Sequence, residues 1–210
     1  MSSKERYPIW PSHEAFYIHS MLFNTSSAMQ ACMKAIKYIE AISEGKVGEQ
    51  EIKDELLDNL HSLINHSGAI ARYFFPSRDS PSKSKSGQKN IHKNRAEDLK
   101  SIFQIDETSP LADKRLRNAI EHFDERLDLY LENGIVGHIF PSLILFEPEN
   151  TDIPHHIFRA FYLKEGIFQI LGEQYYVQSI VDEISRIHHM LVDFDKSGST
   201  FSRRNPNKIQ

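Results

Sequence analysis

Apolar residues in the first half of the chain recur every three or four positions in two long stretches, which is the spacing of one face of an α-helix. We expect a first helix that starts after a capping Ser12. Its apolar face, with Thr25 filling one gap, consists of Ile18, Leu22, Met29, Cys32, Ile36 and Ile39. We expect a second helix that stops before Pro76, because proline cannot continue the hydrogen bonds of a helix. Its apolar face consists of Leu56, Leu60, Leu63, Ile70 and Phe74.

The same spacing predicts two helices in the second half of the chain. The third opens at Ser109 and Pro110, an N-cap followed by a first-turn proline, and closes at Asn133 and Gly134. Its apolar face consists of Leu116, Ile120, Phe123, Leu127 and Tyr130. The apolar face of the fourth consists of Val177, Ile180, Ile184, Ile187 and Leu191. Four helices with one apolar face each most simply pack as an up-down bundle.

Between the third and fourth helices, residues 135–171 lose the helical period. Residues 135–146 and 157–171 are rich in Ile, Phe, Leu and Tyr, and Lys164, Glu165 and Gly166 have the composition of a hairpin turn. The sequence therefore predicts a mainly α protein, a four-helix up-down bundle with a small antiparallel β insertion between helices three and four.

Composition permits one domain of ordinary size. The 210 residues are 40% hydrophobic and 26% charged, and Cys32 is the only cysteine, which excludes an intrachain disulfide and a thiolate zinc cluster. The first ten residues have no apolar leader, and no apolar run is long enough to cross a bilayer. We therefore expect a cytoplasmic protein without a membrane partner.

Basic charge is concentrated in two segments. Residues 76–94 carry a net charge of +4 and residues 195–210 a net charge of +3, although the whole chain is −4. Both segments are rich in Ser, Pro, Gly or Asn, so we expect a flexible basic linker at 76–94 and a basic disordered tail at 195–210, outside a single helical domain of residues 1–194. Such arms could hold a polyanion, and they also have the composition of ordinary solvated linkers.

The candidate chemistry lies in the predicted third helix, where Arg117 is followed by Asn118, three spacer residues and His122. An arginine offers a fork for phosphate oxygens, and a histidine can transfer protons near neutral pH. This arrangement resembles the signature of the HEPN superfamily of helical ribonucleases. The resemblance implies a metal-independent endoribonuclease without a cofactor, in which His122 transfers a proton, Arg117 stabilises charge and Asn118 orients the histidine. It also suggests a defence or toxin effector, with an antitoxin or regulatory protein as a possible partner.

Helical geometry places Arg117 and His122 on opposite sides of the apolar face, because five steps of about 100 degrees leave them about 140 degrees apart around the helix axis. A site that uses both residues needs a second surface, and we expect a homodimer to supply it. The HEPN resemblance similarly implies paired helices whose Arg and His line a cleft at a dimer interface. Arg115 and Arg126 lie on the same side of the helix as His122, so we expect them to bind the RNA substrate.

Two other interpretations stay open. Arg117 with Glu121, and His122 with Arg126, have the i, i+4 spacing of a solvated helix face, which would suit a purely structural helical protein. The same dimer could also be a module that binds RNA or protein without cleavage. The chain has eleven histidines but no Glu-x-x-His pair and no glycine-rich phosphate loop, so we expect neither a metal nor a nucleotide cofactor.

Overall fold

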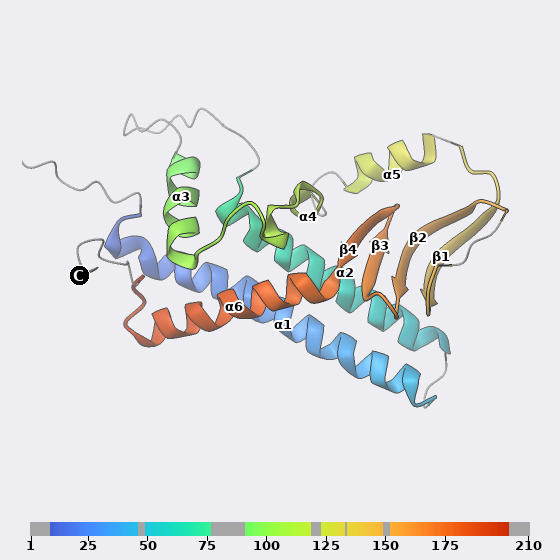
Figure 1. Cartoon of the computed structure of the whole chain (residues 1–210), viewed down its shortest axis with the longest axis horizontal. Helices are drawn as coiled ribbons and strands as arrows, with labels where there is room; N and C mark the ends of the chain where they lie inside the picture. Colours follow the sequence, from blue (N-terminus) through green and yellow to red (C-terminus); the bar gives the residue numbers. More distant parts are fainter. Residues whose placement is uncertain are drawn as a thin grey trace, which may run out of the picture.

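The computed structural model describes residues 9–45, 49–76, 91–118, 123–132, 134–148 and 152–201. The helices are α1 (Glu14–Ser43), α2 (Glu49–Phe74), α3 (Ile91–Phe103), α4 (Lys114–Asn118), α5 (Phe123–Glu132) and α6 (Val177–Lys196), with 3₁₀ turns η1 (Pro11–His13) and η2 (Pro110–Ala112). The strands are β1 (His138–Leu145), β2 (His155–Tyr162), β3 (Ile167–Ile170) and β4 (Glu173–Tyr176). Figure 1 shows α1, α2 and α6 running along the long axis, with the sheet gathered at one end.

The protein is mainly α-helical, as predicted, but the up-down four-helix bundle is not confirmed. Helix α1 packs along both α2 and α6, while the shorter α3, η2 and α4 pack against α2. Helices α2 and α6 have the predicted apolar faces. The buried residues among those positions are Leu56, Leu60, Leu63, Ile70 and Phe74 in α2, and Ile180, Ile184, Ile187 and Leu191 in α6.

The buried face of α1 is shifted from the predicted one. All but one of its members recur at spacings of three and four, namely Glu14, Ile18, Met21, Thr25, Ala28, Cys32 and Ala35; Ala31 is buried as well. The predicted Ile36 is 48% exposed, whereas Ala28 and Ala35 are buried. Because α1 lies between α2 and α6, small side chains on its contact face allow both neighbours to approach closely. Ser12 does not cap this helix, since it lies inside η1 and the N-cap residue is His13.

The predicted third helix is interrupted near its start. Ser109 accepts a hydrogen bond from the Leu111 amide (3.3 Å), but it caps only the short turn η2. Asp113 has an extended backbone and its carboxylate accepts a hydrogen bond from the Arg115 amide (2.8 Å), so a second cap starts α4. Residues 119–122 lie outside the described residues, and α5 begins at Phe123.

Two expectations about flexible segments are corrected. Residues 91–94 of the expected linker belong to α3, which buries Ala96, Leu99 and Phe103 at helical spacing; residues 77–90 lie outside the described residues. In the expected tail, residues 195 and 196 complete α6. Phe201 is buried against Phe103 and Phe194, and its amide donates to the buried Glu14 carboxylate (2.8 Å). Residues 202–210 lie outside the described residues.

The β insertion has four strands in the order β1-β2-β3-β4. The predicted hairpin is confirmed, because β2 and β3 pair antiparallel on either side of residues 163–166. The expectation of a wholly antiparallel insertion is wrong, since β1 and β2 are parallel. Gly137 makes their close start possible: its φ is +124°, and a Cβ there would lie 2.2 Å from the Pro154 carbonyl oxygen. That carbonyl also accepts a hydrogen bond from the His138 amide (3.0 Å).

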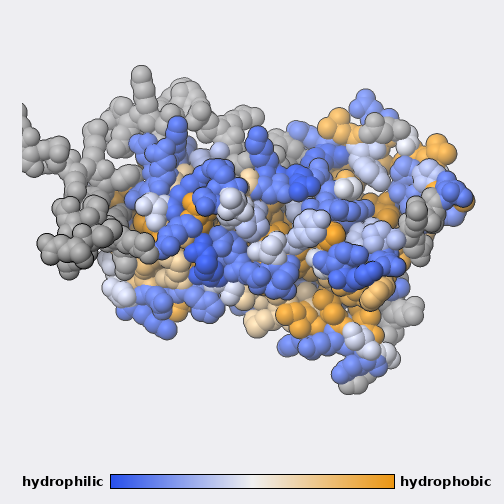
Figure 2. Space-filling view, viewed as in Figure 1, coloured by the Kyte–Doolittle hydropathy of each residue, from blue (hydrophilic) through white to orange (hydrophobic). Residues whose placement is uncertain are grey.

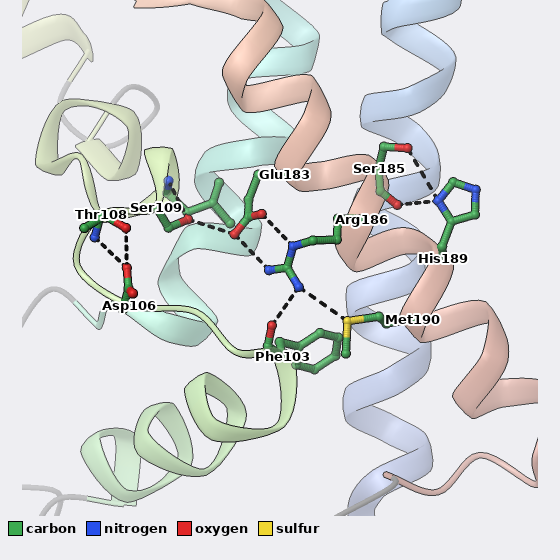
Figure 3. Close-up of polar contacts among 10 residues, drawn as sticks. Phe103, Asp106, Thr108, Ser109, Glu183, Ser185, Arg186, His189 and Met190 are labelled. Carbon is green, nitrogen blue, oxygen red and sulfur yellow. Dashed lines mark hydrogen bonds and ion pairs between the residues drawn. The ribbon is translucent and has the colours of Figure 1, made fainter.

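A polar cluster on α6 fixes the segment that leads into α4 (Figure 3). Arg186 donates two hydrogen bonds to Glu183 (2.8 and 3.0 Å) and one to the carbonyl oxygen of Phe103 (2.7 Å). Glu183 in turn accepts a hydrogen bond from the Ser109 hydroxyl (2.9 Å). Helix α6 therefore holds both ends of residues 103–109, just upstream of the Arg-Asn-x-x-x-His motif.

Candidate functional site

The motif itself lies at the border of the described structure. Arg117 and Asn118 form the end of α4, but their side chains and the whole of His122 lie outside the described residues. Their predicted roles therefore stay predictions. The neighbours of the motif are described: Leu116 is buried, and α4 packs against α2.

The structure brings the two predicted substrate-binding arginines to one carboxylate. Glu173 lies 3.7 Å from Arg115 Nε and 3.9 Å from Arg126 Nη2. Arg115 is also paired with Asp113, with its Nη2 2.7 Å from Oδ2. The hydrogen bond to Asp113 raises the pKa of the Arg115 guanidinium. Two carboxylates thus offset two positive charges, and this flank is less electropositive than the helical projection suggests.

A hollow lies on α2, and one of its lining residues, His61, contacts Phe123, the residue that follows the motif. Its volume is about 530 Å³. Its lining residues are Asn24 from α1 and Asp58, His61, Ser62, Asn65, His66 and Ala69 from α2. The α2 residues recur at i, i+3, i+4, i+7, i+8 and i+11, so they form one face of that helix, polar except for Ala69, beside its apolar face.

His61 lies at the end of this hollow that faces the sheet. Its ring contacts the rings of Phe123 (6.1 Å between centroids) and Phe168 (6.5 Å). Burial lowers the pKa of His61, the positive charge of Arg159 lowers it further, and Asp58 acts in the opposite direction. Arg159 itself is paired with Asp58 and lies 3.7 Å from Asp54. His61 is therefore predominantly neutral at pH 7.

His66 occupies the same face one turn further along. Its Nδ1 lies at hydrogen-bond distance from the Asn24 side-chain oxygen (3.2 Å), and burial lowers its pKa. The ring of Phe23 meets the His66 ring edge-on, 6.3 Å away, and Phe23 is 68% exposed. Between the two histidines, Asn65 Oδ1 is buried and accepts no hydrogen bond from any described residue.

Phe123 connects this hollow to the motif, because it contacts His61 and directly follows His122 in the sequence. The sequence singled out the motif but not the hollow. Its polar residues have the pattern of a solvent-facing helix stripe, and only the packing of α1, α5 and the sheet around α2 partly buries them. The spacing of residues 58, 61, 62, 65, 66 and 69 is the one available signal.

Within the described ranges, no group of three or more His, Cys, Asp or Glu residues is placed to hold a metal ion. No helix in that part of the chain has the length and apolar character needed to cross a membrane. No protein-family model, curated protein or solved structure matches the chain.

Proposed function

We propose that the chain is a metal-independent endoribonuclease of HEPN type. The observation that carries the proposal is the spacing of Arg117, Asn118 and His122, followed directly by a phenylalanine that packs on a partly buried histidine. A setting in a defence or toxin system, with an antitoxin or regulatory protein, rests on the family resemblance alone.

The proposed reaction is internal attack by the ribose 2'-hydroxyl on the adjacent phosphorus. The 2'-oxygen forms a bond to phosphorus, its proton passes to a base, and the bond to the 5'-oxygen breaks as that oxygen takes up a proton. The products are a 2',3'-cyclic phosphate and a 5'-hydroxyl. In this scheme His122 transfers a proton, Arg117 stabilises the charge on the phosphoryl oxygens, and Asn118 orients the histidine.

The proposed homodimer would use the end of the molecule that carries α5 and the sheet. Helix α5 has no buried residue, and β1 lies at an edge of the described sheet. Figure 2 shows apolar residues at the surface of this end. The exposed large apolar residues there are Leu129, Leu131, Ile135, Val136, Ile139, Phe146 and Ile153. Exposed apolar residues in this number favour association, and two of them, Leu129 and Leu131, lie on the helix that directly follows the motif.

A non-catalytic module that binds RNA or protein is the second candidate. The pairing of Arg115 with Asp113, and the approach of both flanking arginines to Glu173, favour the protein-binding form of this module. Charge already offset by carboxylates contributes less to binding of a polyanion.

Incubation of the purified protein with labelled RNA in excess chelator separates the two candidates. We expect cleavage that leaves a 2',3'-cyclic phosphate and is blocked by a 2'-deoxy substitution at the scissile position. Arg117→Ala and His122→Ala should abolish it while the variants remain folded. A requirement for a divalent ion, or full activity of both variants, would refute the assignment.

A further inference from the structure

We propose that the hollow on α2 binds an unpaired nucleobase of the RNA substrate, with Asn65 and His66 as its hydrogen-bonding residues. This inference deepens the proposed function and rests on it for the identity of the polymer. The volume of about 530 Å³ falls in the range of about 300–1,000 Å³ usual for small-ligand sites.

The polar groups of the hollow suit a neutral, planar ligand with adjacent donors and acceptors. Asn65 lines the hollow, and its buried Oδ1 accepts no hydrogen bond from a described residue. A rotation of this amide toward the hollow would let a ligand donor satisfy an atom that is costly to leave unpaired. An Asn side chain offers a donor and an acceptor side by side, which matches the edge of a base. The Nδ1 of His66 is engaged by Asn24, which fixes the orientation of a ring that lines the hollow.

The aromatic surroundings suit a base more than a phosphate. Phe123 and the fully buried Phe168 contact His61 but do not line the hollow. The rings open to a base are those of His61 and His66, which line it, and that of the exposed Phe23 beside His66. Bases stack on such rings without regard to sequence. Burial keeps both histidines neutral by lowering their pKa values, and the nearby cation Arg159 is held by Asp58 and Asp54. The hollow therefore offers little positive charge to an anion.

The test is a titration of the full chain with each of the four nucleoside 5'-monophosphates, followed by NMR of the histidine ring protons. We expect saturable shifts at His61 and His66. Asn65→Ala should weaken binding about 5- to 10-fold, the size expected for one lost hydrogen bond. Asn59→Ala is the matched control, because Asn59 lies on the same helix outside the hollow and bonds the Glu55 carbonyl; it should bind like the parent.

A second variant, His66→Gln, keeps the test valid if Asn65→Ala does not fold. Ribose 5-phosphate serves as the probe without a base, and it should leave the His61 and His66 signals unshifted. Equal shifts with that probe, or equal affinities of the Asn65→Ala and Asn59→Ala proteins, would overturn the nucleobase site.

Cleavage assays on the same proteins separate this inference from the proposed function. If the chain cleaves RNA, Asn65→Ala should raise KM and leave kcat unchanged. Nucleotide binding without any cleavage would refute the nuclease and keep the base site. Cleavage with unaltered KM and binding in Asn65→Ala would refute the base site and keep the nuclease.

Discussion

The core and the outer elements of the sheet end, helix α5 and edge strand β1, differ in how completely their apolar residues are buried, although inner-strand residues such as Phe168 belong to the core. Phe74 of α2 and Ile184 of α6 are fully buried, whereas α5 has no buried residue and Phe146, just after β1, is 66% exposed. The motif precedes α5 in the sequence, so it adjoins the less packed end. Stability should therefore be concentrated in the core of long helices and inner strands, while α5 and β1 are available for binding.

The largest expected effect comes from a matched pair of phenylalanine substitutions. Phe74→Ala should lower the free energy of unfolding by about 3–5 kcal/mol, because it removes a fully buried ring that contacts Phe103. Phe146→Ala should change it by less than about 0.5 kcal/mol. Urea denaturation of both variants measures the difference. Comparable losses would show that the segment just after β1 is as well packed as the core, for example because association buries it.

A smaller effect is expected at the cluster that holds the segment before α4. Burial alone would raise the pKa of Glu183, but the hydrogen bonds from Arg186 and Ser109 together lower it below its usual value. Its ionised form therefore stabilises the fold above the unfolded-state pKa, and this contribution is lost as pH falls through the folded-state pKa. Glu183→Gln should lower the free energy of unfolding by about 1–2 kcal/mol at pH 7, a modest value because Arg186 is partly exposed to solvent. The loss should be smaller at pH 3, where a larger fraction of the Glu183 carboxylates is protonated.

Unfolding curves of the parent and Glu183→Gln proteins at the two pH values check this expectation. Asp182→Asn is the matched control, because it removes an exposed carboxylate from the adjacent position of the same helix. It should change stability by a few tenths of a kcal/mol at either pH. An equal loss in Glu183→Gln at both pH values would mean that its charge does not stabilise this cluster.

Mild acid should lower the free energy of unfolding through histidines both in the hollow and in the core. Burial lowers the pKa values of His61, His66 and His188, with Arg159 adding to the effect at His61 and His189 at His188. The unfolded chain binds protons at these positions first, so stability should fall as pH drops below about 6.5. His61→Gln should reduce this dependence between pH 7.5 and 5.5, as measured by thermal unfolding. An identical pH profile would show that His61 titrates normally in the fold.

The smallest expected effect concerns charge beside the motif. Glu173→Gln should leave Arg115 and Arg126 less neutralised, so RNA binding at low salt should tighten about two- to five-fold and depend more steeply on salt. Glu132→Gln, at the end of α5, removes the same charge at a different place and should have a smaller effect. Fluorescence anisotropy at several salt concentrations measures both. If both variants bind RNA more tightly to the same degree, the effect comes from the net charge of the protein and not from the position of Glu173.

The sequence predicted those elements whose large apolar residues lie on one face. Helices α2 and α6 and the hairpin of β2 and β3 are of this kind. In α1 the contact face includes alanines. A prediction based on large apolar side chains therefore placed Ile36 on that face, whereas the buried residue is the adjacent Ala35. Helix α3 was missed because its short apolar pattern lies within a segment that is otherwise polar.

Other features depend on tertiary contacts that a linear pattern does not contain. The parallel pairing of β1 with β2 rests on the approach of Gly137 to Pro154, whereas a short connection between strands ordinarily favours a hairpin. The candidate motif could be found from spacing alone. The hollow around Asn65 could not, because polar residues on a helix have the same pattern whether they face solvent or a partly buried cavity.

The most direct test of the account measures cleavage and stability on the same preparations of His122→Ala, with Ile184→Val as the core control. We expect His122→Ala to cleave RNA at least 100-fold more slowly, the usual size of lost acid–base catalysis, with its free energy of unfolding within about 0.5 kcal/mol of the parent. Ile184→Val, at a fully buried position, should lose about 1 kcal/mol and keep the parental rate. A folded His122→Ala protein that cleaves RNA at the parental rate would contradict the central claim.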